Sequence, residues 1–354
     1  MIIMRSTLRT HKCLLSGAIV AAILTFFYFN MTTFDSKCDP VIPDSLTRIV
    51  LYWTSVWGRD AVSLLGSRDI HRCSSQCMVT TNRCYQKIAK SVVFHFSDIS
   101  LFDVPSKGEK QAWIYYTSES PANTHLVPSL FLRLMNDKID GVMSYRSDSQ
   151  FPVPYAKVNK KSIEREWIPV PVKPKKVAWF VSNCKTASRR EDFVAEMSKY
   201  IHVDIFGACG DMSCPRGNDT CNRMLEENYS FYLSLENSLC KDYVTEKLYR
   251  TLSYNVIPIV LGPSDNYSIL PNGSFIDAGK FKSMAFLALY LKKVASNETL
   301  FNSFLQWKSK YEVQMLSYED ALCAPCRGDR GPERPESWSA WWFEDAQCYS
   351  WTQS

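Results

Sequence analysis

The chain has 354 residues and carries 41 Lys and Arg against 36 Asp and Glu, a formal net charge of +5. Its hydrophobic content of 46%, with 13% aromatic residues, excludes a disordered protein. The mild, dispersed positive charge gives no reason to expect a nucleic-acid partner.

An apolar, uncharged segment stands near the amino terminus, at residues 13–34. It is just long enough to span a bilayer. Three cations precede it: Arg5, Arg9 and Lys12. By the positive-inside rule we expect a cytosolic tail at 1–12, a transmembrane signal anchor at 13–34 and a short stem at 35–46 beyond the membrane. A cleaved signal peptide is the alternative, and the bulky residues at 26–29 disfavour it because cleavage sites need small residues.

Beyond the stem, hydrophobic patterning predicts alternating strands and helices. In the first half we expect strands near 48–53, 91–96 and 112–116 and a helix near 126–136. A stretch rich in proline and lysine, 152–176, reads as an interdomain linker. In the second half we expect strands near 176–182, 202–206 and 231–235, then helices near 284–294 and 299–311. The length after the anchor is enough for two α/β domains.

The segment that follows residue 231 is the most informative part of the chain. Its order is a strand, a helix that opens near Asp242 and Thr245 and closes near Asn255, and a buried strand that stops at Gly262. Such a right-handed crossover presents ligand sites at strand carboxyl ends and helix amino ends. Lys247 lies in the first helical turn, where backbone amides already favour an anion. A solvated Glu246–Lys247 pair is the alternative interpretation.

Cysteine usage and glycosylation sequons agree with a lumenal location. One of the 13 cysteines, Cys13, lies in the anchor and the other twelve lie beyond it. An even, dense set predicts disulfides, whose pairing the sequence does not give. Zinc ligation by Cys323 and Cys326 with the group at 73–84 is the less favoured alternative. We expect the Trp-rich tail to pack back onto the body, held by Cys348. Five sequons follow the stem: Asn218, Asn228, Asn266, Asn272 and Asn297.

Several motifs, taken together, resemble the α1,3/4-fucosyltransferases (glycosyltransferase family 10), and among them an invertebrate type. The donor motif of that family is matched by FYLSLEN, DYVTEKL, a strand ending in Gly-Pro, and Ser-Phe-Ile after a proline, at 231–237, 242–248, 257–263 and 271–276. Three further elements match: QAWIYYTSESP at 111–121, MSYRSDSQFPVPY at 143–155 and VAWFVSNCKTASRR at 177–190.

The resemblance implies a GT-B fold, in which two Rossmann-like α/β domains face a crevice. It implies an acceptor-side domain at 47–151, a GDP-fucose-binding domain at 177–326 and a Cys/Trp-rich tail at 327–354. It also implies a Golgi type II membrane protein whose partners are GDP-fucose and glycoprotein N-glycans. A homodimer is one option for the oligomeric state.

The implied reaction is inverting transfer of L-fucose from GDP-fucose, in α1,3 linkage, to GlcNAc of an N-glycan core or of lactosamine-type arms. No Asp-x-Asp metal motif occurs in the chain, so we expect no metal cofactor and expect Lys247 and Arg190 to stabilise the GDP leaving group. Glu119 is the expected general base, with His95 as its rival. The remaining expected site residues are the donor contacts Asn237, Tyr243 and Glu246 and the supporting residues Arg146 and Asp148.

Two departures and two alternatives accompany this hypothesis. The family commonly has a glycine where this chain has Tyr254-Asn255, so we expect Asn255 to adopt the positive φ of that turn. The segment 262–271 is shorter than in Lewis-type members and closer to those that modify the N-glycan core. An inactive, glycan-binding relative remains an alternative. A disulfide-rich adhesion ectodomain is a second one, disfavoured because such domains are usually all-β.

Overall fold

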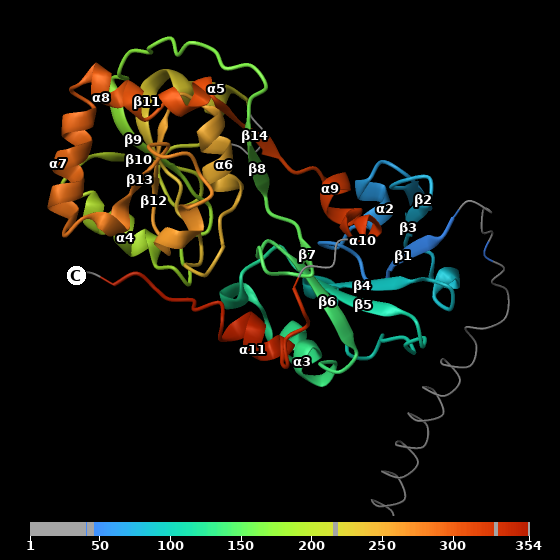
Figure 1. Cartoon of the computed structure of the whole chain (residues 1–354). Helices are drawn as coiled ribbons and strands as arrows, with labels where there is room; N and C mark the ends of the chain where they lie inside the picture. The colour runs from blue at the N-terminus through green and yellow to red at the C-terminus, as the bar shows by residue number, and fades with distance from the viewer. Residues whose placement is uncertain (1–39, 41–45, 215–218, 329–331, 353–354) are drawn as a thin grey trace, which may run out of the picture. The chain divides into compact units, whose positions relative to one another are not determined.

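The computed structural model describes residues 40, 46–214, 219–328 and 332–352, which form two mainly parallel sheets with helices on their faces (Figure 1). The expected cytosolic tail, the expected anchor at 13–34 and most of the stem lie outside the described residues. Within the described ranges, no helix is long and apolar enough to cross a membrane.

The first sheet has seven strands in the order β2-β3-β1-β4-β5-β6-β7, and only β2 and β3 pair antiparallel. The strands, in chain order, are β1 (Arg48–Tyr52), β2 (Ile70–Arg72), β3 (Cys77–Thr80), β4 (Ser91–His95), β5 (Ala112–Tyr116), β6 (Ile139–Ser144) and β7 (Phe151–Pro152). The three strands predicted in this half are confirmed as β1, β4 and β5. β2 and β3 lie on one side of β1, and β4 to β7 lie on the other. This reversal of strand order creates a switch point between β1 and β4.

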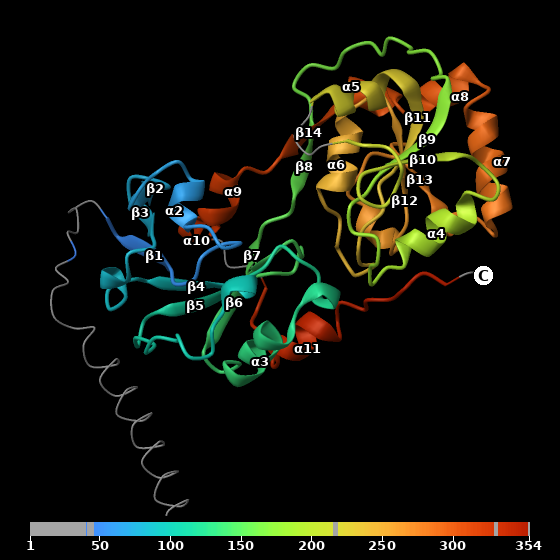
Figure 2. The same ribbon diagram turned by 180° about the vertical axis from the view of Figure 1, so that it is seen from behind.

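Helices cover both faces of this sheet, and three of the five named here come from the far end of the chain (Figure 2). One face packs against α3 (Leu126–Leu134), predicted at 126–136, and α11 (Trp338–Phe343). The other packs against α2 (Ala61–Leu64), α9 (Tyr318–Leu322) and α10 (Ala324–Arg327). The tail therefore packs back onto the body as predicted, with the fully buried Trp338 donating its indole N–H to the Ile139 carbonyl at 3.0 Å.

Disulfides hold these distant segments together. Cys73 bonds Cys323 and Cys77 bonds Cys326, joining the β2–β3 edge to α9 and α10. Three potential metal ligands do meet, at His71, Cys73 and Cys323, but the two sulfurs are bonded to each other, so the zinc alternative is wrong for these cysteines. The predicted domain boundary at 326 grouped α9 and α10 with the second half, whereas they pack on the first sheet.

The second sheet has five parallel strands in the order β10-β9-β11-β12-β13. They are β9 (Lys175–Phe180), β10 (Val203–Phe206), β11 (Tyr229–Leu233), β12 (Ile257–Val260) and β13 (Ile276–Asp277). One face packs against α4 (Arg190–Met197), α7 (Met284–Val294) and α8 (Glu298–Ser303). α5 (Asp219–Asn228) and α6 (Glu246–Ser253) pack elsewhere on the sheet. The predicted β11–α6–β12 crossover is confirmed, with Phe231 in register with Ile257.

One helix prediction in the second half is wrong in its later part, and the predicted linker contains a strand. The expected helix at 299–311 ends with α8, and a 3-10 turn (Gln306–Ser309) leads into β14 (Tyr311–Met315). Apolar residues alternate with polar ones along β14, which is strand patterning. β14 pairs antiparallel with β8 (Ala156–Lys160), a strand inside the predicted linker.

The turn that follows α6 also differs from expectation. The helix ends at Ser253, its C-cap Tyr254 is extended, and the Asn255 N–H donates to Glu226 at 3.1 Å. Asn255 is not among the described residues with positive φ, so the expected left-handed asparagine is wrong. At the other end Thr245 caps the helix as predicted, whereas Asp242 has a φ of 61° and accepts hydrogen bonds from Ser147.

Candidate functional site

The switch point of the second sheet lies between β9 and β11, where the strand order reverses. Ligands of doubly wound sheets bind outside the strand carboxyl ends at this place. The chain leaves β9 toward Arg190, the first residue of α4, and leaves β11 toward Glu236 and Asn237. Ser188 joins the two segments, since its N–H donates to the Asn237 carbonyl at 3.0 Å and its hydroxyl to the Glu236 carbonyl at 2.8 Å.

Arg190 is a buried cation at this point, whereas its neighbour Arg189 is exposed. The residue is only 4% exposed, and this burial lowers the pKa of its guanidinium. The guanidinium donates to the Leu235 carbonyl at 2.7 Å and to the Asn183 carbonyl at 3.3 Å. Its Nε has no partner within the described residues. A buried donor without a partner costs free energy and is uncommon in folded proteins.

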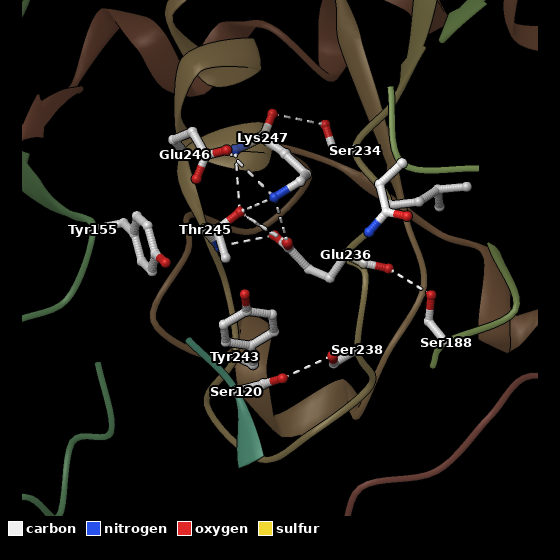
Figure 3. A network of polar contacts seen from close by, with 12 residues as sticks. Ser120, Tyr155, Ser188, Ser234, Glu236, Ser238, Tyr243, Thr245, Glu246 and Lys247 are labelled. Carbon is white, nitrogen blue, oxygen red and sulfur yellow. Dashed lines mark hydrogen bonds and ion pairs between the residues drawn. The ribbon is translucent and has the colours of Figure 1, made fainter. Parts of the chain in front are cut away.

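Lys247 belongs to a buried ionic cluster at the start of α6, shown in Figure 3. Its ammonium lies 3.2 Å from Glu236 Oε2, 3.3 Å from Glu246 Oε1 and 2.8 Å from the Thr245 hydroxyl. Glu236 also accepts the Thr245 backbone N–H at 2.8 Å and the Thr245 hydroxyl at 2.8 Å. The first turn of α6 and the end of β11 are thereby fixed to each other.

The charges in this cluster set each other's protonation. Burial alone would lower the pKa of Lys247, but Glu236 and Glu246 raise it. Burial alone would raise the pKa of Glu246, and Lys247 lowers it. Lys247 is therefore held as an ammonium ion that is oriented before any ligand arrives, which is the requirement for electrostatic stabilisation of an anion.

Glu236 is the residue that sequence reasoning passed over. It lies just past the strand predicted at 231–235, is 3% exposed, and its carboxylate anchors both Thr245 and Lys247. The available signal is a charged residue placed directly after the mainly apolar strand predicted at 231–235. A buried carboxylate requires a partner, and Lys247 is the cation that the matched donor motif offers.

Glu119 and Tyr243 meet although they come from different halves of the chain. The Tyr243 hydroxyl donates to Glu119 Oε2 at 3.2 Å, and the Asn123 amide donates to the same oxygen at 3.1 Å. Next to this pair, Ser120 donates to the Ser238 hydroxyl at 2.7 Å (Figure 3). Glu119 is half-buried and follows β5, so it lies at the carboxyl edge of the first sheet, beside the loop that carries Tyr243.

His95 ends β4 at the switch point of the first sheet and is completely buried. Its Nδ1 lies 2.8 Å from Asp98 Oδ2, while its Nε2 has no partner in the described chain. Burial lowers the pKa of its imidazole, although Asp98 opposes the effect. Trp57 lies against it with ring centroids 4.8 Å apart. Because the imidazole is enclosed, Glu119 is the more accessible of the two candidate bases.

Arg146 and Asp148 are joined to each other and to the carboxyl-terminal tail. The Arg146 guanidinium donates to Asp148 at 2.8 and 2.7 Å, contacts Asp345, and donates to the Trp341 carbonyl at 2.6 Å. The Trp341 ring lies 4.0 Å from its Cζ. With these bonds made, the pair attaches the tail and does not present a free cation.

The remaining predicted residues differ in accessibility. Asn237 is half-buried, and its Oδ1 has no partner among the described residues.

The asparagines of the glycosylation sequons also differ in accessibility. Asn272 and Asn297 are exposed, whereas Asn218 lies outside the described residues. Asn228 donates its amide to the Met224 carbonyl at 3.0 Å. Asn266 is buried and donates its amide to the Cys240 carbonyl at 2.8 Å, so a glycan at this nitrogen is incompatible with the folded chain.

Two α/β sheets, each with a switch point, and two cations at one of them, Arg190 buried and Lys247 half-buried, define a ligand site suited to an anion. Comparison with known families specifies it further. Residues 45–156 match the model described as "Fucosyltransferase, N-terminal", and residues 170–336 match "Glycosyltransferase family 10 (fucosyltransferase) C-term". The chain belongs to glycosyltransferase family 10, the fucosyltransferases.

Curated relatives agree with this assignment. Alpha-(1,3)-fucosyltransferase C of Drosophila melanogaster is 32% identical over 344 residues, covering 86% of this chain and 80% of the relative. Alpha-(1,3)-fucosyltransferase fut-1 of Caenorhabditis elegans is 33% identical over 328 residues, covering 87% of this chain and 72% of the relative. A crystal structure of an α1,3-fucosyltransferase with GDP-fucose shares the fold, with a TM-score of 0.50 at 16% identity over 82% of this chain and 92% of that one.

Proposed function

We propose that the protein transfers L-fucose from GDP-fucose, with inversion and in α1,3 linkage, to GlcNAc of glycoprotein glycans. The observation that carries this proposal is the pair of oriented cations, Arg190 and Lys247, at the start of two helices beside one switch point. A diphosphate bound there meets the unpartnered Arg190 Nε, the Lys247 ammonium and the amides of the helix amino ends. Asn237, with its free Oδ1, is positioned for hydroxyl or base contacts, and Glu246 for sugar hydroxyls.

In the proposed reaction Glu119 takes the proton from the acceptor hydroxyl as that oxygen attacks the anomeric carbon of fucose. The bond from this carbon to the β-phosphate oxygen breaks, and its electron pair leaves with GDP. Arg190 and Lys247 stabilise the charge that develops on the leaving diphosphate. Tyr243 and Asn123 orient the Glu119 carboxylate through the hydrogen bonds already described.

The proposed acceptor side is the carboxyl edge of the first sheet. Glu119 follows β5, and the neighbouring switch point between β1 and β4 carries Trp57 and His95. Trp57 is 44% exposed and has a φ of 55°, a strained conformation fixed by hydrogen bonds from the Trp57 and Gly58 amides to Asp98. An exposed indole held beside a catalytic edge suits the apolar face of a sugar ring.

We further propose a Golgi membrane location with the catalytic body in the lumen. The basic-then-apolar sequence at 1–34 supports a signal anchor, and the five disulfides defined among the described residues suit an oxidising compartment. Protease protection of microsomes that contain the full chain tests the orientation, because only residues before the anchor are then digested.

The transfer reaction is tested by incubating the secreted chain, from residue 40 onward, with labelled GDP-fucose. The acceptor panel holds an N-glycan that presents its core, lactosamine and its GalNAc-bearing analogue, each with and without EDTA. Labelled product in the presence of EDTA supports metal-independent transfer, and the labelled acceptor identifies core or outer-arm specificity. A folded protein that binds GDP but labels no acceptor points to a glycan-binding relative. Failure to bind GDP contradicts the proposal.

A further inference from the structure

The segment that follows α11, residues 345–352, crosses from the first sheet to the donor site and is called the C-terminal strap here. The first residues of the strap contact the half of the protein that contains the first sheet. Asp345 pairs with Arg146, and α11, immediately before it, is anchored by the buried Trp338 and Trp342. The strap thus leaves the first sheet from a rigid attachment.

The strap next pairs with the loop of residues 236–245, called the donor loop because it carries Glu236, Asn237, Tyr243 and Thr245. The Lys241 N–H donates to the Ala346 carbonyl at 2.9 Å, and the Tyr349 N–H donates to the Leu239 carbonyl at 3.0 Å. Between these two bonds, Cys348 forms a disulfide with the fully buried Cys240. The donor loop is therefore fixed to the strap by main-chain and covalent bonds.

Beyond the disulfide the strap contacts the segment that leads to Arg190. Ser350 donates its hydroxyl to the Ala187 carbonyl at 2.7 Å, and the Trp351 N–H donates to the Ser188 carbonyl at 2.9 Å. The Trp351 ring meets Phe193 of α4 edge-on, with centroids 5.6 Å apart. The strap therefore holds both segments that deliver the donor-site groups, one on each side of the β9–β11 switch point.

We propose that the strap is a positioning element for GDP-fucose, with Cys348 and Trp351 as its positioning residues. None of its residues supplies a charge to the diphosphate. Instead, it fixes the spacing of the Arg190 segment and the donor loop, so that the site is formed before the donor arrives. Preorganisation of this kind lowers the entropy lost on binding. This inference rests on the proposed function, because it assigns a role at the proposed donor site.

The test is a kinetic comparison of the full chain with the variant Cys240→Ser/Cys348→Ser, which removes the covalent bond and leaves no free thiol from the pair. We expect the KM for GDP-fucose and the Kd for GDP to rise about tenfold, equivalent to about 1.4 kcal/mol. The KM for the acceptor stays within twofold of the wild type. A purely structural loss would instead lower the active fraction and leave both KM values unchanged.

The matched control is Cys73→Ser/Cys323→Ser. It removes a disulfide from the other half, where the neighbouring Cys77–Cys326 bond keeps the same segments joined. We expect no change in the KM for GDP-fucose. Trp351→Ala provides a second test that leaves every disulfide in place, and we expect it to raise the same KM by about threefold through loss of the Phe193 contact.

The outcomes separate this inference from the proposed function. If the wild-type chain does not bind GDP, the proposed function fails and the inference fails with it. If the wild type binds GDP and a folded Cys240→Ser/Cys348→Ser variant binds it equally well, only the role of the strap is overturned. An equal rise in the KM values of donor and acceptor also overturns it, because the effect is then not specific to the donor site.

Discussion

Glu236 offers the sharpest test of how the donor site is built. The change Glu236→Ala removes a buried carboxylate that accepts the Thr245 N–H at 2.8 Å and pairs with Lys247 at 3.2 Å. It leaves the Thr245 amide without that acceptor and Lys247 with Glu246 alone. Breaking a buried pair in this way costs about 3–5 kcal/mol of unfolding free energy. Glu236→Gln keeps an oxygen for Thr245 and loses only the charge, so we expect a smaller cost of about 1–3 kcal/mol.

The assay is urea unfolding of the secreted chain near neutral pH, followed by tryptophan fluorescence and extrapolated to water. Glu246→Gln is the matched control. Its carboxylate lies about as close to the same ammonium, at 3.3 Å, but its side chain is one-third exposed. Solvent screening reduces the expected cost to about 1 kcal/mol or less. If Glu236→Ala costs no more than Glu246→Gln, the cluster does not hold the first turn of α6 and the reasoning is refuted.

Three further predictions concern the reaction and its pH dependence. Glu119→Gln should lower the turnover number by about 10²–10⁴-fold with GDP affinity unchanged, and near-normal turnover would show that Glu119 is not the base. Lys247→Ala should weaken GDP binding by about tenfold or more, as measured by calorimetry, whereas unchanged GDP affinity would remove Lys247 from the donor site. Because burial lowers the pKa of His95 below its ordinary 6.5, the folded state disfavours the imidazolium, and unfolding free energy should fall as the pH drops below about 6.5. His95→Asn should flatten this part of the stability profile, and an unchanged slope would contradict the assignment.

Sequence patterning was sufficient where one local rule decided the structure. The apolar runs at β11 and β12, with Thr245 between them as an N-cap, predicted the crossover unit and its parallel pairing. The same patterning located α7, and the resemblance placed the donor motif at its strand and helix ends. These features depend on residues within a few positions of each other, so the sequence contains the information directly.

Predictions failed where a contact with a distant segment decided the outcome. β14 is a strand because β8, about 150 residues earlier, pairs with it, and a five-residue alternating run is too short to reveal this. Asn266 satisfies a glycosylation sequon, yet its amide is occupied by the Cys240 carbonyl. Arg146 is predicted only as a supporting residue beside Asp148, and its pairing with Asp345 in the tail cannot be read from the local sequence. Such pairings depend on the tertiary fold and not on local sequence.

Three helices that cover the first sheet are among the last parts of the chain to be synthesised, which affects how the protein folds during translation. The disulfide partners of Cys73 and Cys77 are 250 and 249 residues further along the chain, so these bonds form only after those partners are synthesised. At ordinary translation rates of about 5–20 residues per second, that delay is roughly 12–50 s. During this time the nascent first sheet lacks α9, α10 and α11, so apolar surface on both of its faces is exposed and two thiols are reactive. The amino-terminal half is therefore completed only after the last helices leave the ribosome.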